Sequence, residues 1–281
     1  MAPYFSVILR TRDGVHIDAA HTPYRSALHA GEPPVASLRH TGVVSHGAPA
    51  GRERVGGEQP RLGIVLAHGF TGSWREQTTR RITHALSAFG GVLSFDFRGH
   101  GRSAGESTVG DSEVFDVEAA VRHVRGLDYD RVAVVGFSMG AATAVRHAAL
   151  HGGVDAVVAV SGPSRWYYRG TRSMRRVHWA IEQPLGRAVA RLVKGTRVRS
   201  ASWDPVPAAP HEVAGLIAPT PLLVVHGDAD AFFPVEHAYQ LYGAAREPKE
   251  LWIEQGYGHA ESAATPALIN KIGRWIHHRI P

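Results

Sequence analysis

Short apolar runs alternate with segments of helical periodicity over most of the chain. The apolar runs have strand length and cover residues 61–67, 92–97, 131–135, 154–160, 221–225 and 250–253. Helical spacing of apolar residues follows in residues 75–89, 112–127, 141–150, 235–245 and 264–278. Strands buried on both faces are typically apolar throughout, and parallel strands require crossover helices between them. The pattern therefore predicts an α/β protein with a mostly parallel sheet covered by helices on both faces.

The N-terminal part of the chain has a different pattern. Residues 4–11 and 15–20 predict two strands joined by a turn at Arg12-Asp13-Gly14, as in a hairpin. Residues 21–60 are rich in glycine and proline and predict a long loop. Within this loop we expect a short strand at about residues 38–44 and a flexible stretch at about residues 49–60.

One segment interrupts the alternation of strands and helices. Residues 163–215 contain two stretches with amphipathic helical spacing, at residues 171–183 and 186–193. The first stretch places these side chains on one face: Met174, Val177, His178 and Ile181. The second places Arg187, Arg191 and Lys194 opposite Ala188, Val189, Leu192 and Val193. The sequence predicts a helical, arginine-rich lid here, with residues 1–162 and 216–281 forming the core.

The run RVAVVGFSMGAATAVRHAAL, residues 131–150, contains the strongest chemical signal. A strand leads into GFSMG and an alanine-rich helix follows, so Ser138 lies at a sharp strand-to-helix turn. The flanking Gly136 and Gly140 leave room for close backbone packing at such a turn. This arrangement is a nucleophile elbow, which exposes the serine hydroxyl at the start of a helix.

Composition narrows the class of protein and its chemistry. The 281 residues are 44% hydrophobic and 20% charged, which is ordinary for a globular protein, and there is no cysteine. Disulfides, thiol nucleophiles and cysteine zinc sites are therefore excluded. The sequence contains no apolar run long enough to span a bilayer and no secretory signal pattern at its start. We expect a soluble, cytoplasmic protein without a transmembrane segment, and the sequence leaves its oligomeric state open.

The net charge of +6 is unevenly distributed. Residues 163–203 carry ten Lys or Arg side chains against one acidic residue, Glu182, so the rest of the chain is slightly acidic. A basic segment on an acidic body does not favour a nucleic-acid-binding protein. Two interpretations remain for this segment: solvated arginines on two amphipathic helices, or a surface that attracts an acidic substrate group, an acyl-coenzyme A, an acidic carrier protein or an anionic membrane.

Five short motifs together resemble the α/β-hydrolase fold superfamily, in particular its lid-bearing esterases and its serine aminopeptidase-like members. They are HGFTGS (residues 68–73), DFRGHGRS (96–103), GFSMG (136–140), GDADAFFP (227–234) and GYGH (256–259). The resemblance covers the chain from about residue 62 to its end. It implies a mostly parallel, eight-stranded sheet and places residues 163–215 where the family has its variable lid.

The resemblance also implies a catalytic triad in the family order of serine, acid and histidine. Ser138 matches the nucleophile and His259 the general base. Asp230, four residues before Pro234, matches the acid that orients the histidine. Asp228 is the competing acid, but the motif match favours Asp230, and the other role open to Asp228 is to cap backbone amides in a turn. Two backbone amides, those of Phe70 and Met139, match the oxyanion hole.

Other polar and aromatic residues near these motifs receive structural interpretations. His68 and the turn containing His100 are expected to shape the loops, and His277 and His278 to be solvated on the last helix. Glu254 follows the wrong strand to supply the acid. Trp74 suits either the pocket or the core. Four aromatic side chains suit either the wall of a pocket or the packing of the lid: Trp166, Tyr167, Tyr168 and Trp179.

The expected function is that of a serine hydrolase that cleaves an ester or a thioester through an acyl-enzyme. A peptidase, a carbon–carbon hydrolase and a biosynthetic lyase or cyclase are alternatives on the same fold, and a non-catalytic ligand receptor is an alternative of another class. A haloalkane dehalogenase is disfavoured because it requires a carboxylate at position 138. We expect no metal or organic cofactor and no nucleic-acid partner. The expected ligand is a small acyl substrate, either neutral, acidic or carrier-bound.

Overall fold

The computed structural model describes residues 3–25 and 61–280. Eight strands form one sheet in the order β1-β2-β4-β3-β5-β6-β7-β8. The strands are β1 (Phe5–Arg10), β2 (His16–Thr22), β3 (Leu62–Ala67), β4 (Gly91–Phe95), β5 (Arg131–Phe137), β6 (Ala156–Val160), β7 (Leu222–Gly227) and β8 (Lys249–Glu254). The predicted mostly parallel, eight-stranded sheet is thereby confirmed. The predicted strand at about residues 38–44 and the flexible stretch at about residues 49–60 lie outside the described residues.

The sheet combines an antiparallel edge with a parallel body. β1 pairs with β2 as the predicted hairpin, and β2 adds to β4 in antiparallel register, with Ala19 opposite Phe95. All the pairings from β4 through β8 are parallel. Because parallel strands end at the same edge, the segments that follow β3, β5, β7 and β8 are brought together there. The residues of the five sequence motifs occupy these segments and the one after β4.

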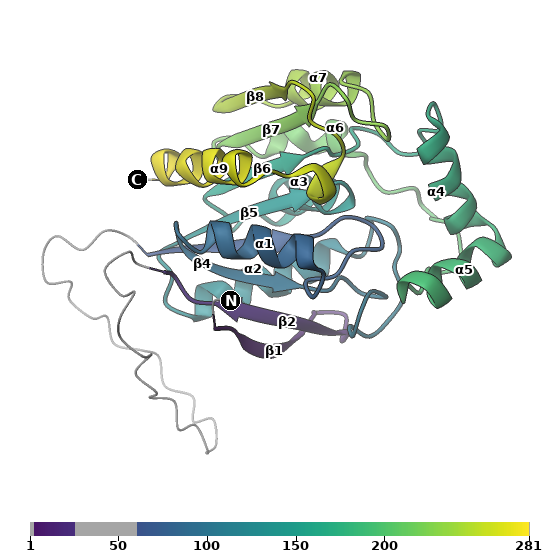
Figure 1. Ribbon diagram of the computed structural model, residues 1–281, viewed down its shortest axis with the longest axis horizontal. Coiled ribbons are helices and arrows are strands. Elements are labelled where there is room, and N and C mark those ends of the chain that lie inside the picture. Colours follow the sequence, from purple (N-terminus) through teal and green to yellow (C-terminus); the bar gives the residue numbers. More distant parts are fainter. Residues whose placement is uncertain (1–2, 26–60, 281) are drawn as a thin grey trace, which may run out of the picture.

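Helices cover both faces of the sheet (Figure 1). They are α1 (Gln77–Leu86), α2 (Val114–Gly126), α3 (Met139–His151), α4 (Arg172–Glu182), α5 (Pro184–Lys194), α6 (Pro210–Val213), α7 (Glu236–Ala244), α8 (Ala260–Ala263) and α9 (Pro266–Arg279), with a 3-10 turn η2 (Ala214–Leu216). One apolar layer joins α1 and α9 to the sheet, and the other joins α2, α3 and α7 to its opposite face. Both layers are built from the apolar positions that gave the helices their periodicity.

The α4–α5 segment, residues 163–215, lies at one end of the molecule (Figure 1). Its two long helices agree with the predicted ones to within two residues at each end. The short helices α6 and α8 were not predicted, because four residues are too few to establish a helical period. In the described residues, no helix is both long and apolar enough to cross a lipid bilayer.

Candidate active site

The turn between β5 and α3 is reduced to a single residue. Ser138 has φ 51° and ψ −114°, and α3 begins at the next residue. A Cβ on Gly136 would lie 2.2 Å from the carbonyl oxygen of Gly140, and one on Gly140 would lie 2.3 Å from that of Ala67. The two glycines therefore permit the strand and the helix to pack backbone against backbone. This contact places the Ser138 side chain at the edge where the parallel strands end.

His259 and Asp230 reach this serine from two other strand ends. His259 lies in the turn after β8, and its Nε2 is 3.0 Å from Ser138 Oγ. Its Nδ1 is 2.8 Å from Oδ2 of Asp230, which follows β7. The other carboxylate oxygen of Asp230 accepts hydrogen bonds from the backbone N–H groups of Phe232 (2.7 Å) and Phe233 (3.1 Å). The structure thus brings together the three residues that the sequence predicted as a triad.

The two phenylalanines also hold the imidazole of His259 in place. The Phe232 ring stacks on it with centroids 4.2 Å apart and an interplanar angle of 26°, and Phe233 lies 5.7 Å away at a tilted angle. Beneath them, His226 donates from Nε2 to the Phe233 carbonyl at 2.9 Å. The side chain of Asp230 is fully buried in this cluster. A buried carboxylate with two backbone donors stays in one orientation, so it keeps His259 in one orientation as well.

Two buried histidines shape the loop that follows β3. His68 Nε2 accepts from Phe97 N–H at 3.1 Å, so its Nδ1 carries the proton donated to Gly69 O at 2.7 Å. His100 Nε2 accepts from Thr71 N–H at 3.2 Å. Burial lowers the pKa of both imidazoles to about 4. Both rings are therefore neutral at neutral pH, as their acceptor roles require, and both shape the loop as predicted.

The two amides predicted for the oxyanion hole come from the start of α3 and from the loop after β3. Met139 is the first residue of α3, where the N–H groups of a helix have no partner in the preceding turn. Phe70 lies in the loop after β3, between Gly69 and Thr71, both of which are held by hydrogen bonds to side chains. Both residues line the same cavity as Ser138. The binding of a carbonyl oxygen by these two amides stays a prediction.

Glu261 is a site residue that the sequence analysis did not identify. Its Oε1 accepts from Gly69 N–H at 2.5 Å, across 192 positions of sequence. It follows Ala260, which has φ 49°, a conformation that is strained in a residue with a side chain. A Cβ on Gly69 would lie 3.2 Å from Glu261 Oε2 and 3.3 Å from Ser138 Cβ, so all three residues meet. Glu261 thereby ties the turn carrying His259 to the loop carrying Phe70.

Burial raises the pKa of the Glu261 carboxyl. The group thus carries its negative charge less readily than a surface glutamate. This matters because a full negative charge beside Ser138 opposes the formation of an oxyanion there. No sequence pattern indicates this role of Glu261, because its hydrogen-bond partner is the backbone N–H of Gly69, which is distant in sequence.

Replacing Glu261 by Ala is expected to lower kcat by about 10-fold or more with little change in KM, because the loop that carries Phe70 loses its hydrogen bond. Glu261→Gln keeps an oxygen acceptor for Gly69 N–H and should restore most of the rate. Steady-state kinetics on a chromogenic ester measures both parameters. Glu254→Ala is the matched control, because Glu254 pairs with Lys271 at the surface. Equal losses in the Gln and Ala variants of Glu261 would contradict this role.

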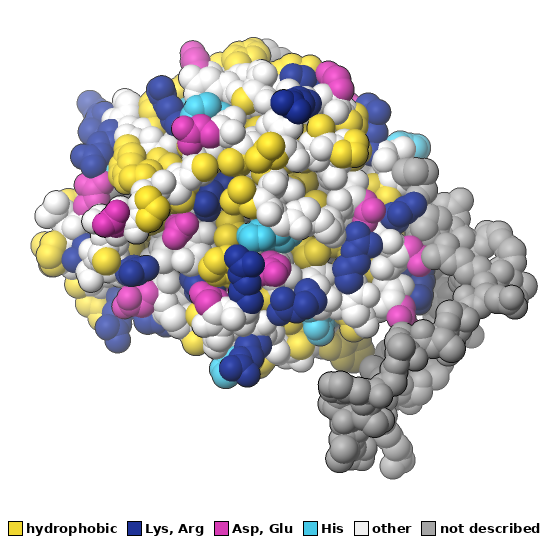
Figure 2. Space-filling view, turned by 180° about the vertical axis from the view of Figure 1, so that it is seen from behind, with side chains coloured by type: hydrophobic (Ala, Val, Ile, Leu, Met, Phe, Trp, Pro, Cys, Tyr) yellow, Lys and Arg dark blue, Asp and Glu magenta, His cyan; other side chains and the backbone are white. Residues whose placement is uncertain are grey.

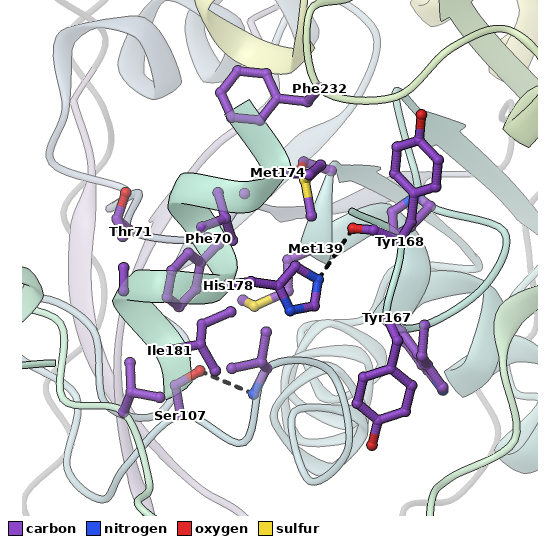
Figure 3. A pocket seen from close by; sticks show the side chains of 18 of the residues that line it. Phe70, Thr71, Ser107, Met139, Tyr167, Tyr168, Met174, His178, Ile181 and Phe232 are labelled. Atoms are coloured by element: carbon purple, nitrogen blue, oxygen red, sulfur yellow. Dashed lines mark hydrogen bonds between the residues drawn. The ribbon is translucent and has the colours of Figure 1, made fainter. Parts of the chain in front are cut away.

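A cavity of about 680 Å³ lies over Ser138 and His259. Most of its wall is apolar or aromatic, and Figure 3 shows how Phe70, Met139, Met174, His178 and Ile181 surround one space. All four side chains predicted for the apolar face of α4 line the cavity, and other residues of the same helix, among them Arg176 and Glu182, line it as well. His178 is fixed in this wall, with Nδ1 2.8 Å from Glu182 and Nε2 3.1 Å from the Tyr168 carbonyl.

The structure resolves several interpretations that the sequence left open. Trp74 is 4% exposed and donates to Asp18, so it belongs to the core and not to the cavity. Trp166, Tyr167 and Tyr168 line the cavity, whereas Trp179 is exposed to solvent.

The polar alternatives also occupy the places expected of them. Asp228 accepts from Gly256 N–H at 2.6 Å in a turn, and His277 and His278 are exposed. Among the residues that the structure describes, no group of three or more acidic or histidine side chains is arranged to hold a metal ion.

The sheet order, the strand-to-helix turn at Ser138 and the cavity at the ends of the parallel strands define an α/β-hydrolase fold. The model of the Alpha/beta hydrolase family matches residues 64–270, most of the chain. The chain therefore belongs to this family and is a hydrolase.

Two proteins and one solved structure illustrate what the chain is similar to. An uncharacterized protein of Bacillus subtilis, YqkD, is 29% identical, and the match covers 71% of this chain and 65% of YqkD, just under two thirds of its length. A monoacylglycerol lipase of Mycolicibacterium smegmatis is 28% identical, over 77% of this chain and 88% of the lipase. The solved structure of the Pyrococcus furiosus esterase Pf2001 has a TM-score of 0.70 at 23% identity, covering 100% of this chain and 92% of the esterase. That structure is similar in fold.

Proposed function

We propose that the protein is a serine carboxylester hydrolase in which Ser138, His259 and Asp230 form the catalytic triad. The observation that carries the proposal is the hydrogen-bonded sequence of side chains from Ser138 Oγ through both nitrogens of His259 to a buried carboxylate. Ser138 and His259, two members of this hydrogen-bonded series, line an apolar cavity. A serine in this setting has a base within reach and a site for the acyl chain of a substrate.

The first half of the reaction forms an acyl-enzyme. His259 Nε2 takes the hydroxyl proton while Ser138 Oγ attacks the ester carbonyl carbon. The carbonyl oxygen becomes negative and is bound by the N–H groups of Phe70 and Met139. Asp230 stabilises the positive imidazolium, which then gives its proton to the departing alcohol. The carbon–oxygen bond to the alcohol breaks and the acyl group remains on Ser138.

The second half releases the acid. His259 accepts a proton from water, and the resulting nucleophile attacks the acyl carbon. The oxyanion forms again at the same two amides. Its collapse breaks the bond to Ser138, which recovers its proton from His259. Every proton in both halves is exchanged through one imidazole, and the net reaction consumes one ester and one water.

The apolar wall supports substrates with a hydrophobic acyl chain. Side chains from α4 form much of this wall, so we propose that the α4–α5 segment acts as a lid that sets the substrate range. The relative named as a monoacylglycerol lipase supports an ester of a small alcohol with such an acyl group. A thioester of an acidic carrier is the second candidate, favoured by Arg165, Arg176 and Arg199 in the cavity wall.

A substrate panel distinguishes these candidates. We expect turnover of p-nitrophenyl esters with a preference for medium over short acyl chains, and slower turnover of acyl-coenzyme A thioesters and amino-acyl p-nitroanilides. Ile181→Trp should narrow the cavity and shift the preference toward short chains, whereas the control Val189→Trp, outside the cavity, should not. If thioesters are turned over faster than all esters, with a rate that falls as salt rises, the carrier-thioester function replaces the ester hydrolase.

A further inference from the structure

The α4–α5 segment is anchored to the core mainly at its two ends. Near these ends, Ser164 and Trp203 each make a hydrogen bond to the core. The ion pairs of Arg169 and His178, both with Glu182, stay within the segment. Seen from behind, this end of the molecule carries hydrophobic side chains among basic and acidic ones (Figure 2). Within the described residues, no ion pair joins the two helices to the core.

Helix α5 packs on α4. The buried residues of α5 are Gly186 and Ala190. A Cβ on Gly186 would lie 2.2 Å from the Trp179 carbonyl oxygen, so α5 rests directly on the backbone of α4. The apolar Leu192 of α5, by contrast, is 84% exposed. The position of α5 is therefore tied to that of α4.

A threonine hydroxyl joins α4 to the core. Thr171, the N-cap of α4, donates its hydroxyl proton to the Phe232 carbonyl at 2.9 Å. The same oxygen accepts from Met174 N–H at 3.1 Å, which caps the helix. Over the described parts of the chain, this is the one hydrogen bond from residues 169–194 to the core, residues 1–162 and 216–281. Thr171 thus fixes the start of α4 to a single carbonyl group.

The residue that owns this carbonyl touches two members of the proposed triad. Phe232 N–H donates to Asp230 at 2.7 Å, and the Phe232 ring stacks on the imidazole of His259 with centroids 4.2 Å apart. The N–H of Phe232 is therefore held by Asp230 and its carbonyl by Thr171. Because both polar groups of its backbone are held, the ring that supports His259 keeps one position.

Helix α4 also forms part of the cavity in which the acyl chain is proposed to bind. Met174 and Ile181 from α4 line this cavity, and so does Phe232 (Figure 3). Thr171 is not among the described residues that line it. An acyl chain that contacts α4 therefore acts on the helix whose N-cap holds Phe232. The hydrogen bond connects the wall of the cavity to the triad, although Thr171 itself does not touch the substrate.

We propose that Thr171 is a positioning residue of this hydrolase. Its hydroxyl seats α4 on the loop after β7 and holds Phe232, which in turn keeps His259 and Asp230 in the catalytic arrangement. The role rests on the proposed function, because it presupposes that Ser138 is the nucleophile. A seated α4 gives an ordered triad, so the cavity wall and the catalytic side chains respond to the substrate together.

Replacing Thr171 by valine removes the hydroxyl and keeps the shape of the side chain. We expect kcat toward a medium-chain p-nitrophenyl ester to fall about 10-fold with KM within about 2-fold, because the triad loses order while the cavity wall remains. Labelling of Ser138 by diisopropyl fluorophosphate should slow by a similar factor, since this small probe requires the activated serine but not the acyl-chain site. Thr171→Ser keeps the hydroxyl and should restore both rates to within about 2-fold of the wild type.

Thr265→Val is the matched control. Thr265 is the N-cap of α9 and accepts from Leu268 N–H at 3.2 Å, just as Thr171 accepts from Met174. Within the described residues it makes no hydrogen bond to the loop after β7. The valine variant also removes a helix cap, yet we expect kcat and the labelling rate to stay within about 2-fold of the wild type. Thermal unfolding verifies that each variant is folded at the assay temperature.

Four results would overturn the role of Thr171 alone. Wild-type rates in Thr171→Val would show that the triad does not need the hydrogen bond. Equal losses in Thr171→Ser and Thr171→Val would show that the hydroxyl is not the cause. An equal loss in Thr265→Val would assign the effect to any lost helix cap, and a change confined to KM would assign it to substrate binding. A wild-type protein that is not labelled at Ser138 would instead overturn the proposed function, and this role with it.

Discussion

Ser138→Ala is expected to lower kcat toward p-nitrophenyl esters by about 10⁶-fold, because the variant lacks the oxygen that would form the acyl-enzyme. The fold should be retained, since the two flanking glycines make the close contacts of the turn. Stopped or continuous assays of nitrophenolate release measure the loss, and thermal unfolding verifies the fold.

The matched control for this variant is Ser200→Ala. Ser200 is exposed and lies outside the cavity wall, so its hydroxyl has no role in the proposed reaction. We expect the control to keep the wild-type rate within about 2-fold, as is usual for surface substitutions. A Ser138→Ala protein that retains more than about a thousandth of the wild-type kcat would argue against a serine acyl-enzyme.

Asp230→Asn is expected to lower kcat by about 10⁴-fold, because the substitution changes which ring nitrogen of His259 carries the proton. The backbone N–H groups of Phe232 and Phe233 point at one oxygen of Asp230 and would select the amide oxygen of the asparagine. The amide NH₂ would then face His259 Nδ1 and make it an acceptor. The ring proton would move to Nε2, which could no longer take the proton of Ser138.

The neighbouring aspartate provides the control for this prediction. Asp228→Asn keeps an oxygen that can accept from Gly256 N–H and is expected to change kcat by less than about 5-fold. Initial rates over a range of substrate concentrations separate kcat from KM. If Asp228→Asn is the more damaging variant, the acid of the triad has been assigned to the wrong residue.

The sequence was sufficient for the features that depend on local pattern. Strands β3, β5 and β7 are buried on both faces, which is why they were visible as continuous apolar runs. The strand-to-helix turn at Ser138 could be predicted because its geometry requires a glycine on both sides of the serine. The order of serine, acid and histidine then followed from the family's motifs, and the structure places these three side chains within hydrogen-bonding distance of one another in turn.

The features that were missed depend on contacts between distant segments. Glu261 lies two residues after His259, yet its role arises from Gly69 on another strand end. The orientation of α5 was predicted only as an amphipathic pattern, because a pattern does not indicate which side packs when Gly186 allows a backbone contact. Trp74 suited two environments equally, and a hydrogen bond to Asp18 on the edge hairpin decided between them.

Covalent labelling of the full chain by a fluorophosphonate, read by intact mass and peptide mapping, tests most directly whether Ser138 is the nucleophile. Such a probe reacts with a serine hydroxyl that a neighbouring base activates. We expect one adduct per chain, located on Ser138 and absent from Ser138→Ala, with much slower labelling of His259→Ala. An unlabelled wild-type protein, or an adduct that persists in Ser138→Ala, would contradict the assignment of Ser138 as the nucleophile.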